Sequence, residues 1–358
     1  MELSREITGR LLAWYDENKR PLPWREDREP YHIWLSEVMC QQTRVEAVKA
    51  YYRRFLQELP TIESLAHCPE ERLFKLWEGL GYYSRARHLR QAAEMICGEH
   101  GGVFPIDYDA IRSLPGIGDY TAAAIASICF ELPCPAVDGN VLRVVTRLCA
   151  STADIAKEST KAEVRRSLLP LFEDVSSGML NQALMELGAL VCLPNHDPVC
   201  AHCPLLELCP SASGLWKEIP FKTVKKARRK ECHTVLLLRC GGAWALRKRP
   251  DRGLLAGLWE FPNLPGSLEA QTALDTAAGW GCRPVSLLRC LEKSHIFTHV
   301  EWKLPAWVIE CQNRVADFTW VSLEDIEDRY SLPTAFRQFL EDIEQIKENY
   351  DEKSDTIH

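Results

Sequence analysis

The sequence of 358 residues has no long apolar run, because no stretch approaches the roughly eighteen consecutive apolar residues that a transmembrane helix needs. Its opening stretch, MELSREITGRLLAWYDENKR, predicts a charged amphipathic helix and lacks the basic cap and apolar core of a signal peptide. Internal repeats and low-complexity tracts are also missing. We therefore expect an intracellular protein that makes no contact with a membrane.

An excess of positive charge, which is common in proteins that bind nucleic acid, is missing as well, because the formal net charge is -7. The excess acid lies at the C-terminal end, where residues 321–358 carry eleven Asp and Glu against four Lys and Arg. The rest of the chain is neutral overall, and KTVKKARRK at 222–230 is a dense basic run. This run is either a solvated linker or a contact with DNA, so the net charge does not exclude a nucleic-acid partner.

The length of the chain exceeds the usual size of one hydrophobic core and predicts two domains. Up to about residue 190, apolar residues recur at spacings of three and four between short Pro and Gly breaks, which predicts successive helices. Beyond a polar stretch, strand-like runs flank Gly241 and Gly242. The sequence predicts a multidomain protein with an all-α domain over 1–212, a basic linker over 213–230, an α+β domain over 231–345 and an acidic tail over 346–358.

Fifteen cysteines in a reducing compartment do not indicate a disulfide framework, and their odd number leaves at least one of them unpaired. Four of them lie within eighteen residues with the spacing C-x7-C-x2-C-x5-C, namely Cys192, Cys200, Cys203 and Cys209. Four thiolates on one compact loop favour an iron–sulfur cluster over zinc, which more often binds two separated C-x2-C knuckles. The spacing alone leaves zinc open.

An apolar glycine turn, LPGIG, opens directly into the alanine-rich stretch DYTAAAIAS. Gly116 and Gly118 allow backbone N–H groups to point outward, and the start of the following helix contributes its positive end, so the segment suits a phosphate. The alternative is an ordinary turn between packed helices. Asp138 and Asn140 precede another apolar helix, where Asp138 by itself is more simply interpreted as an N-cap or turn residue.

The order L-P-G-x-G, V-D-G-N and a four-cysteine loop resembles the helix-hairpin-helix DNA glycosylases of the endonuclease III superfamily, which carry an iron–sulfur cluster. Within that superfamily, LPWR (22–25), PYHIWLSEVMCQQTRV (30–45) and GLGYYSRARHL (79–89) are similar to the MutY-type adenine DNA glycosylases. The resemblance implies a monomer whose four cysteines hold a [4Fe–4S] cluster. It also implies base excision repair on double-stranded DNA containing adenine opposite 8-oxoguanine or guanine.

Cleavage of the bond between adenine and its sugar is suited to two carboxylates in different environments. Glu37 is the only charged residue between Ile33 and Met39, where burial would raise its pKa. By resemblance, Glu37 protonates adenine N7 and then activates water, while Asp138 stays ionised beside Asn140 and stabilises the developing positive charge. Without the resemblance, Glu37 is better interpreted as a buried structural residue.

Tyr120 stands where the strand-cleaving relatives carry a lysine that attacks the sugar to form a Schiff base. Because a tyrosine cannot form that adduct, the resemblance implies a monofunctional hydrolase that leaves an abasic site. Tyr120 and Asn140 would then form hydrogen bonds around the two carboxylates. Position alone is also compatible with simple packing of Tyr120 in the first turn of a helix.

A base inside a duplex must be extruded before it can react, and another group must fill the gap. The resemblance assigns these contacts to residues that would each be interpreted as ordinary packing in isolation: Gln42, Thr43, Leu80 and Tyr82 toward DNA and the lesion, and Trp24 and Arg25 in the adenine pocket. Cys40 replaces the leucine of the family's MLQQT, and the first cysteine gap has seven residues where six are usual. These two departures affect the detail of the pocket and the shape of the cysteine loop.

The C-terminal domain, with DRGLLAGLWEFPN, resembles the Nudix fold. Nucleotide hydrolysis in that fold needs a glutamate-rich helix to hold magnesium, but the corresponding stretch has only Glu269 and Asp275. The resemblance therefore implies a recognition module without pyrophosphatase activity. Its reader would be Phe297, Thr298 and His299, at the place of the family's Phe-Ser-His, although the segment by itself is more simply a turn between strands.

Three other functions remain open from the residues. A bifunctional pyrimidine-specific endonuclease is disfavoured by Tyr120 and by the additional C-terminal domain, and a nucleotide pyrophosphatase is disfavoured by the missing glutamates. A non-catalytic DNA-binding protein that carries a cluster is disfavoured by the presence of Glu37 and Asp138.

Overall fold

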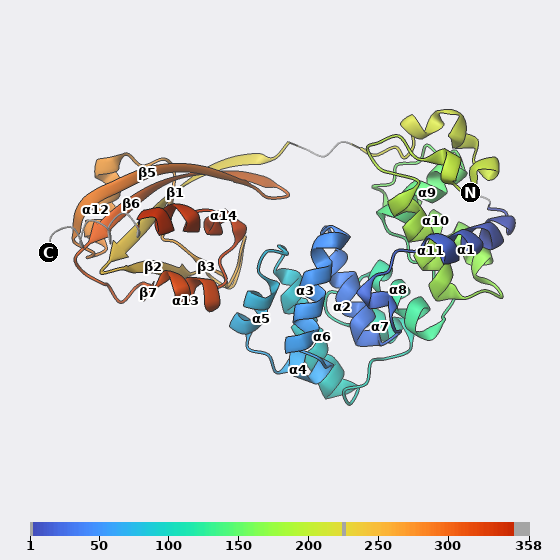
Figure 1. Cartoon of the computed structure of the whole chain (residues 1–358), viewed down its shortest axis with the longest axis horizontal. Helices are drawn as coiled ribbons and strands as arrows, with labels where there is room; N and C mark the ends of the chain where they lie inside the picture. Colours follow the sequence, from blue (N-terminus) through green and yellow to red (C-terminus); the bar gives the residue numbers. More distant parts are fainter. Residues whose placement is uncertain (1–2, 224–226, 347–358) are drawn as a thin grey trace. The chain divides into compact units, whose positions relative to one another are not determined.

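The protein forms two compact units in a computed structural model that describes residues 3–223 and 227–346 (Figure 1). Unit 1 comprises Met1–Cys68 and Arg87–Lys225, and unit 2 comprises Pro69–Ala86 and Lys226–His358. The centre of the basic run, 224–226, and nearly all of the predicted acidic tail, 347–358, lie outside the described residues. The linker and tail boundaries therefore stay predictions.

All regular structure in the described part of unit 1 is helical. Its α-helices are α1 (Glu6–Asn18), α2 (Pro30–Cys40), α3 (Val45–Glu58), α4 (Ile62–Ala66), α6 (Ser84–Glu99, which begins in unit 2), α7 (Tyr108–Ser113), α8 (Asp119–Phe130), α9 (Gly139–Leu148), α10 (Glu158–Leu168) and α11 (Ser177–Leu190). Its 3-10 helices are η1 (Pro23–Arg25), η2 (Leu169–Phe172), η3 (Cys200–His202), η4 (Leu206–Leu208), η5 (Pro210–Ser213) and η6 (Leu215–Lys217). Across the residues that the structure describes, no helix is both long and apolar enough to span a bilayer.

Local sequence signals fix where several of these helices begin. The Asp107 side chain caps α7 by accepting from two backbone N–H groups, and the Ser176 side chain caps α11 by accepting from the backbone N–H of Met179. Pro30 occupies the first turn of α2, where its missing N–H costs no hydrogen bond. The central helix α11 contacts α1, α8 and α9, and a buried core joins α1, α9, α10 and α11. This core holds the loop before α9 against α11, which positions Asp138.

Unit 2 contains one mixed sheet and a few short helices. Its strands are β1 (Arg229–Cys240), β2 (Ala243–Lys248), β3 (Trp259–Glu260), β4 (Asn263–Pro265), β5 (Pro284–Ile296), β6 (Val300–Cys311) and β7 (Thr319–Val321), and its helices are α5 (Glu70–Trp77), α12 (Ala270–Gly279), α13 (Leu323–Asp328) and α14 (Thr334–Arg337). The strand order is β3-β2-β1-β6-β5, with β4 paired to β1 and β7 paired to β2. Only the pairing of β1 with β6 is parallel among the described strand pairs.

The alternation of side chains along β1 divides the core of unit 2 into two layers. Val235 and Leu237 pack on the same face as the buried residues of α13 and α14, whereas Leu236 and Leu238 pack on the face covered by α12. The sheet therefore lies between α12 on one face and α13 with α14 on the other. The predicted order of an all-α domain followed by an α+β domain is confirmed.

The segment 69–86 belongs to unit 2, although it lies between α4 and the rest of α6 in the chain. Ser331 donates a hydrogen bond to the carbonyl oxygen of Phe74 at 3.2 Å, and Phe74 packs edge-to-face on Tyr83 at 5.6 Å. Chain order alone did not indicate this arrangement. It brings the predicted DNA contacts Leu80 and Tyr82 into the unit that contains the predicted lesion reader.

Candidate active site

A cavity of about 930 Å³ in unit 1 is lined by α2, α8, α9, α11 and η1. The predicted site residues that line it are Glu37, Tyr120, Asp138, Asn140, Trp24, Arg25, Gln42, Thr43, Gly116 and Gly118. These residues come from four separate stretches of sequence. The fold thus brings together the predicted carboxylates, the predicted adenine pocket and the predicted glycine turn.

Glu37 projects from α2 into this cavity, where it is half-buried. Tyr120 Oη donates a hydrogen bond to Glu37 Oε2 at 2.6 Å. Burial raises the pKa of Glu37 to about 7, and this hydrogen bond opposes the shift by favouring the ionised form. The nearby negative charge of Asp138 acts in the same direction as burial. Glu37 can therefore both give and accept a proton near neutral pH.

Tyr120 is the second residue of α8 and follows the glycine turn directly. Its hydroxyl also lies 3.3 Å from the sulfur of Met185. Burial, together with the carboxylates of Glu37 and Asp138, raises the pKa of Tyr120 well above its ordinary value. The phenol therefore stays protonated and acts as a donor to Glu37.

Asp138 is the N-cap of α9. One of its carboxylate oxygens accepts from the backbone N–H of Val141 at 2.7 Å, and the other accepts from Asn140 Nδ2 at 2.8 Å. Burial raises the pKa of Asp138, while these two donors oppose the shift by stabilising the carboxylate. The Asp138 side chain thus both caps α9 and lines the cavity.

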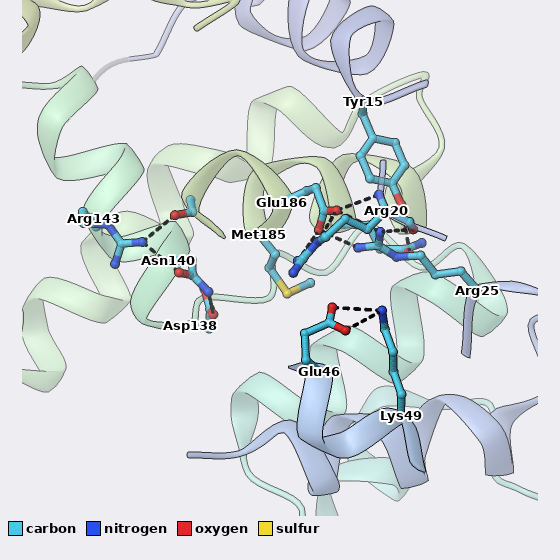
Figure 2. A network of polar contacts seen from close by, with 12 residues as sticks. Tyr15, Arg20, Arg25, Glu46, Lys49, Asp138, Asn140, Arg143, Met185 and Glu186 are labelled. Carbon is cyan, nitrogen blue, oxygen red and sulfur yellow. Dashed lines mark hydrogen bonds and ion pairs between the residues drawn. The ribbon is translucent and has the colours of Figure 1, made fainter. Parts of the chain in front are cut away.

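Asn140 connects this site to the first cysteine of the predicted cluster. Its Oδ1 accepts from Arg143 Nη2 at 2.8 Å, and Arg143 Nε donates to the carbonyl oxygen of Cys192 at 2.7 Å. A Cβ atom added at Gly188 would lie 2.5 Å from the Cβ of Asn140, so only glycine permits this close approach of α11. Figure 2 shows Arg143, Asn140 and Asp138 in this order.

Glu186 is a site residue that sequence reasoning missed. It is buried in α11 and lines the same cavity. Arg20 and Arg25 pair with its Oε2 at 2.8 and 2.9 Å, as Figure 2 shows. Burial alone would raise the pKa of Glu186, but the hydrogen bonds from Arg20 and Arg25 outweigh it and lower the pKa to about 2. Glu186 stands alone in the apolar run LMELGAL, which is the same signal that indicated Glu37.

The other predicted pocket residues are held by aromatic contacts or by an unusual backbone conformation. Trp24 is buried and packs edge-to-face on Tyr52 at 5.4 Å. The Arg25 guanidinium lies 5.5 Å from the centroid of the Tyr15 ring. Gln42, which lines the cavity, has a φ of 59° in the turn that follows α2.

The two glycines of the turn play different parts. Gly116 has a φ of 76°, and a Cβ there would lie 2.5 Å from the Cβ of His88, so another residue would be strained and crowded. Gly118 is the N-cap of α8, and a Cβ there would meet no atom within 4 Å. Open space therefore adjoins the start of α8.

The four predicted cluster ligands line a second, small cavity of about 30 Å³ in unit 1. Arg147 also lines it and donates a hydrogen bond to the sulfur of Cys192 at 3.2 Å. Among the residues that the structure describes, no three His, Cys, Asp or Glu side chains are arranged so that they could hold a metal ion. Four thiols around one cavity are the donor type that an iron–sulfur cluster uses. Their side chains are not placed in this structure as a set of metal ligands.

Five of the predicted DNA and lesion contacts lie in unit 2, namely Leu80, Tyr82, Phe297, Thr298 and His299. Phe297, Thr298 and His299 form the loop between β5 and β6, and Phe297 packs edge-to-face on Trp302 at 4.9 Å. Tyr82 is 45% exposed, and its hydroxyl lies 2.6 Å from Thr298 Oγ1. Leu80, in contrast, is buried.

The two acidic residues of the stretch that corresponds by resemblance to the magnesium-binding helix of Nudix hydrolases, Glu269 and Asp275, belong to α12 and its N-cap. Glu269 is the N-cap of α12, and Asp275 accepts from Gln271 Nε2 at 2.8 Å. Both carboxylates are exposed. Neither belongs to a group of three or more His, Cys, Asp or Glu side chains that could hold a metal ion among the described residues.

Two stretches of the chain match known families. Residues 35–170 match the HhH-GPD superfamily of base excision DNA repair proteins, and residues 233–342 match the NUDIX domain. The solved structure of a thermostable thymine-DNA glycosylase is similar to the chain with a TM-score of 0.53 at 26% identity, covering 58% of this chain and 96% of that chain. The two family matches and the fold therefore define a helix-hairpin-helix protein of base excision repair, joined to a Nudix-like domain.

The similarity to complete relatives is more specific. The chain is 36% identical to the adenine DNA glycosylase of Mus musculus, covering 81% of this chain and 68% of the mouse protein. It is 31% identical to that of Schizosaccharomyces pombe, covering 88% of this chain and 85% of the yeast protein. The chain belongs to the adenine DNA glycosylase family, which confirms the resemblance seen in the sequence. It spans 56 to 68% of the length of the first four curated relatives that it matches.

Proposed function

We propose that this protein is a monofunctional DNA glycosylase that excises adenine mispaired with 8-oxoguanine or guanine, as a hydrolase of base excision repair. The observation that carries the proposal is the 2.6 Å hydrogen bond from Tyr120 to Glu37 in a cavity that Asp138 also lines. It joins a carboxyl with a pKa of about 7 to a second carboxylate held by two donors. This is the pair of unlike carboxylates that cleavage of a glycosidic bond uses.

The proposed reaction begins when adenine is extruded from the duplex into the cavity of unit 1. Glu37 donates its proton to adenine N7 while the bond between the sugar and N9 breaks and its electrons pass to the base. Asp138 stabilises the positive charge that develops on the sugar. Water then adds to the sugar carbon and gives a proton to Glu37, which restores the carboxylic acid and leaves an abasic site.

The same geometry supports a monofunctional reaction. A strand-cleaving glycosylase needs an amine that attacks the sugar. Tyr120 instead contributes a protonated phenol beside Glu37, where it orients the carboxyl group. Hydrolysis therefore ends at the abasic site and leaves the strand uncut.

The partner that we propose is double-stranded DNA, bound by a monomer inside the cell. The open space at Gly118 and the positive end of α8 suit a phosphate of the backbone. Gln42 and Thr43 line the same cavity and would contact the bases beside the extruded adenine. Unit 2 would act as a recognition module, with Tyr82, Phe297, Thr298 and His299 reading the base opposite the adenine.

We propose that Cys192, Cys200, Cys203 and Cys209 hold a [4Fe–4S] cluster, which would tie their loop to the remainder of unit 1. The four thiols around one cavity support this assignment. Protein purified without oxygen should contain iron and show the broad visible absorption of such clusters. Protein with one equivalent of zinc and no iron would contradict the assignment.

Three duplexes test the proposed activity directly. They carry adenine opposite 8-oxoguanine, thymine opposite guanine, and thymine glycol opposite adenine. We expect release of adenine from the first duplex alone, with strand cleavage only after alkali treatment. Release of thymine or thymine glycol would favour a pyrimidine-specific enzyme, and binding without release of any base would favour a non-catalytic protein.

A further inference from the structure

Tyr82 is held in a closed turn at the end of α5. Gly79, Gly81 and Tyr82 have φ values of 96°, 69° and 47°, which fold the chain back within four residues. Trp77 Nε1 donates to the carbonyl oxygen of Gly81 at 3.0 Å, and the guanidinium of Arg85 lies 5.6 Å from the centroid of the Tyr82 ring. Because the turn is closed, the position of α5 determines the position of Tyr82.

Glu78 attaches this turn to the helices that cover the sheet. Its side chain is 10% exposed and accepts three hydrogen bonds. The donors are Leu332 N at 2.9 Å, Lys75 Nζ at 2.8 Å and Arg337 Nη1 at 2.7 Å. A single carboxylate thus joins the end of α5 to the segment around α14.

Two neighbouring contacts complete the attachment. Lys75 Nζ also donates to the carbonyl oxygens of Ile326 and Tyr330 at 3.2 and 3.3 Å. The buried hydroxyl of Ser331 donates to the carbonyl oxygen of Phe74 at 3.2 Å. Such hydrogen bonds specify one arrangement of α5 against residues 326–337, because each alternative would leave polar groups of low exposure unpaired.

The result of this attachment is the 2.6 Å contact between Tyr82 Oη and Thr298 Oγ1. We infer that Glu78 is a positioning residue for lesion recognition: it fixes the turn that holds Tyr82, so that Tyr82 and Thr298 act as one reader of the base opposite adenine. This inference rests on the proposed function. Glu78 lies in unit 2, whereas the carboxylates proposed for the chemistry lie in unit 1. Its loss should therefore change substrate preference and leave basal excision intact.

The test compares Glu78→Ala with Glu71→Ala in the full-length protein. Glu71 is the matched control, since it lies on α5, of which Glu78 is the C-cap, and forms an exposed ion pair with Lys248 at 3.2 Å. Single-turnover excision of adenine is measured opposite 8-oxoguanine and opposite guanine at one salt concentration. We expect Glu78→Ala to lower the ratio of the two rates roughly five- to tenfold without changing the rate opposite guanine, and Glu71→Ala to leave the ratio unchanged.

A double variant separates positioning from general damage. If Glu78 acts through the reader, Glu78→Ala combined with Thr298→Ala should lower the ratio no further than Thr298→Ala alone. Additive losses, an equal fall in both rates, or an unchanged ratio would each overturn the inference. If Glu78→Ala does not fold, as judged by thermal unfolding, Glu78→Gln and Arg337→Ala are measured in its place, and an unchanged ratio in both overturns it. A parent protein that releases no adenine would instead refute the proposed function.

Discussion

Two glutamates that line the candidate active-site cavity have pKa values shifted in opposite directions. Glu37 and Glu186 both stand alone in apolar helical runs and line the same cavity. Glu37 faces a neutral phenol and has a pKa of about 7, whereas Glu186 faces two guanidinium groups and has a pKa of about 2. Burial raises the pKa of both carboxyl groups. The hydrogen bonds from Arg20 and Arg25 outweigh burial at Glu186, whereas the single hydrogen bond from Tyr120 does not outweigh it at Glu37.

This comparison shows how one fold can hold a reactive acid beside a permanent anion. Tyr120 gives Glu37 a single uncharged hydrogen-bond donor, so the carboxyl proton of Glu37 stays available for transfer. Arg20 and Arg25 give Glu186 charged donors that keep it ionised throughout the physiological range. Glu186 therefore organises the wall of the cavity, while Glu37 is suited to proton transfer.

The largest expected effect is on catalysis. Glu37→Gln removes the transferable proton but keeps the shape of the side chain, so adenine release should fall by about 10²–10⁴-fold. Binding to the mismatched duplex should change little, because the carboxyl group acts on the leaving base rather than on phosphates. Single-turnover excision and a binding titration on the same duplex measure the two quantities. Excision at the parent rate would remove Glu37 from the mechanism.

Replacing Glu186 and replacing Glu37 should change the free energy of unfolding in opposite directions. Glu186→Gln breaks a buried pairing with two arginines and should lower the free energy of unfolding at pH 7 by about 3 kcal/mol. Glu37→Gln should instead raise it by about 2 kcal/mol at pH 8, because the parent must ionise a carboxyl group whose pKa the fold has raised. Denaturant titrations at both pH values measure these changes.

Glu46→Gln is the control for these stability measurements, because Glu46 forms an ion pair with Lys49 while its side chain is 74% exposed (Figure 2). Its free energy of unfolding should change by less than about 0.5 kcal/mol. The contribution of Glu186 depends on its lowered pKa, so it is present above the ordinary pKa of glutamate and disappears as the pH falls toward 2. Stability that is independent of pH in this range would contradict the pairing.

The smallest expected effect comes from the phenol. Tyr120→Phe removes the hydrogen bond that favours the ionised form of Glu37, so the pKa of Glu37 should rise further. Because the acid must be protonated to act, the fall of the excision rate on the alkaline side should move to higher pH by about one unit. A pH–rate profile of both proteins measures the shift. If the excision rate of the variant instead falls at a lower pH than that of the parent, Tyr120 does not favour the ionised form of Glu37.

Motifs and periodicity predicted much of the fold and part of the site. The helical spacing, the change to strand-like runs and the separated motifs led to both domain types, and Glu37 with Asp138 lie in one cavity as expected. Glu186 was missed although it carries the same sequence signal, because its arginine partners lie some 160 residues away in the chain. The placement of residues 69–86 in unit 2 was missed for the same reason, since it depends on contacts with residues 326–337.

The protonation states of Glu37 and Glu186 can be measured directly. In protein labelled with ¹³C at the glutamate carboxyl carbons, Glu37→Gln and Glu186→Gln assign the two resonances, and their chemical shifts are followed with pH. We predict that Glu37 titrates with a midpoint near 7 and that Glu186 stays ionised down to pH 4. Two resonances that both titrate near the ordinary pKa of glutamate would contradict the account, because the partners in the cavity would then not control the state of either carboxyl group.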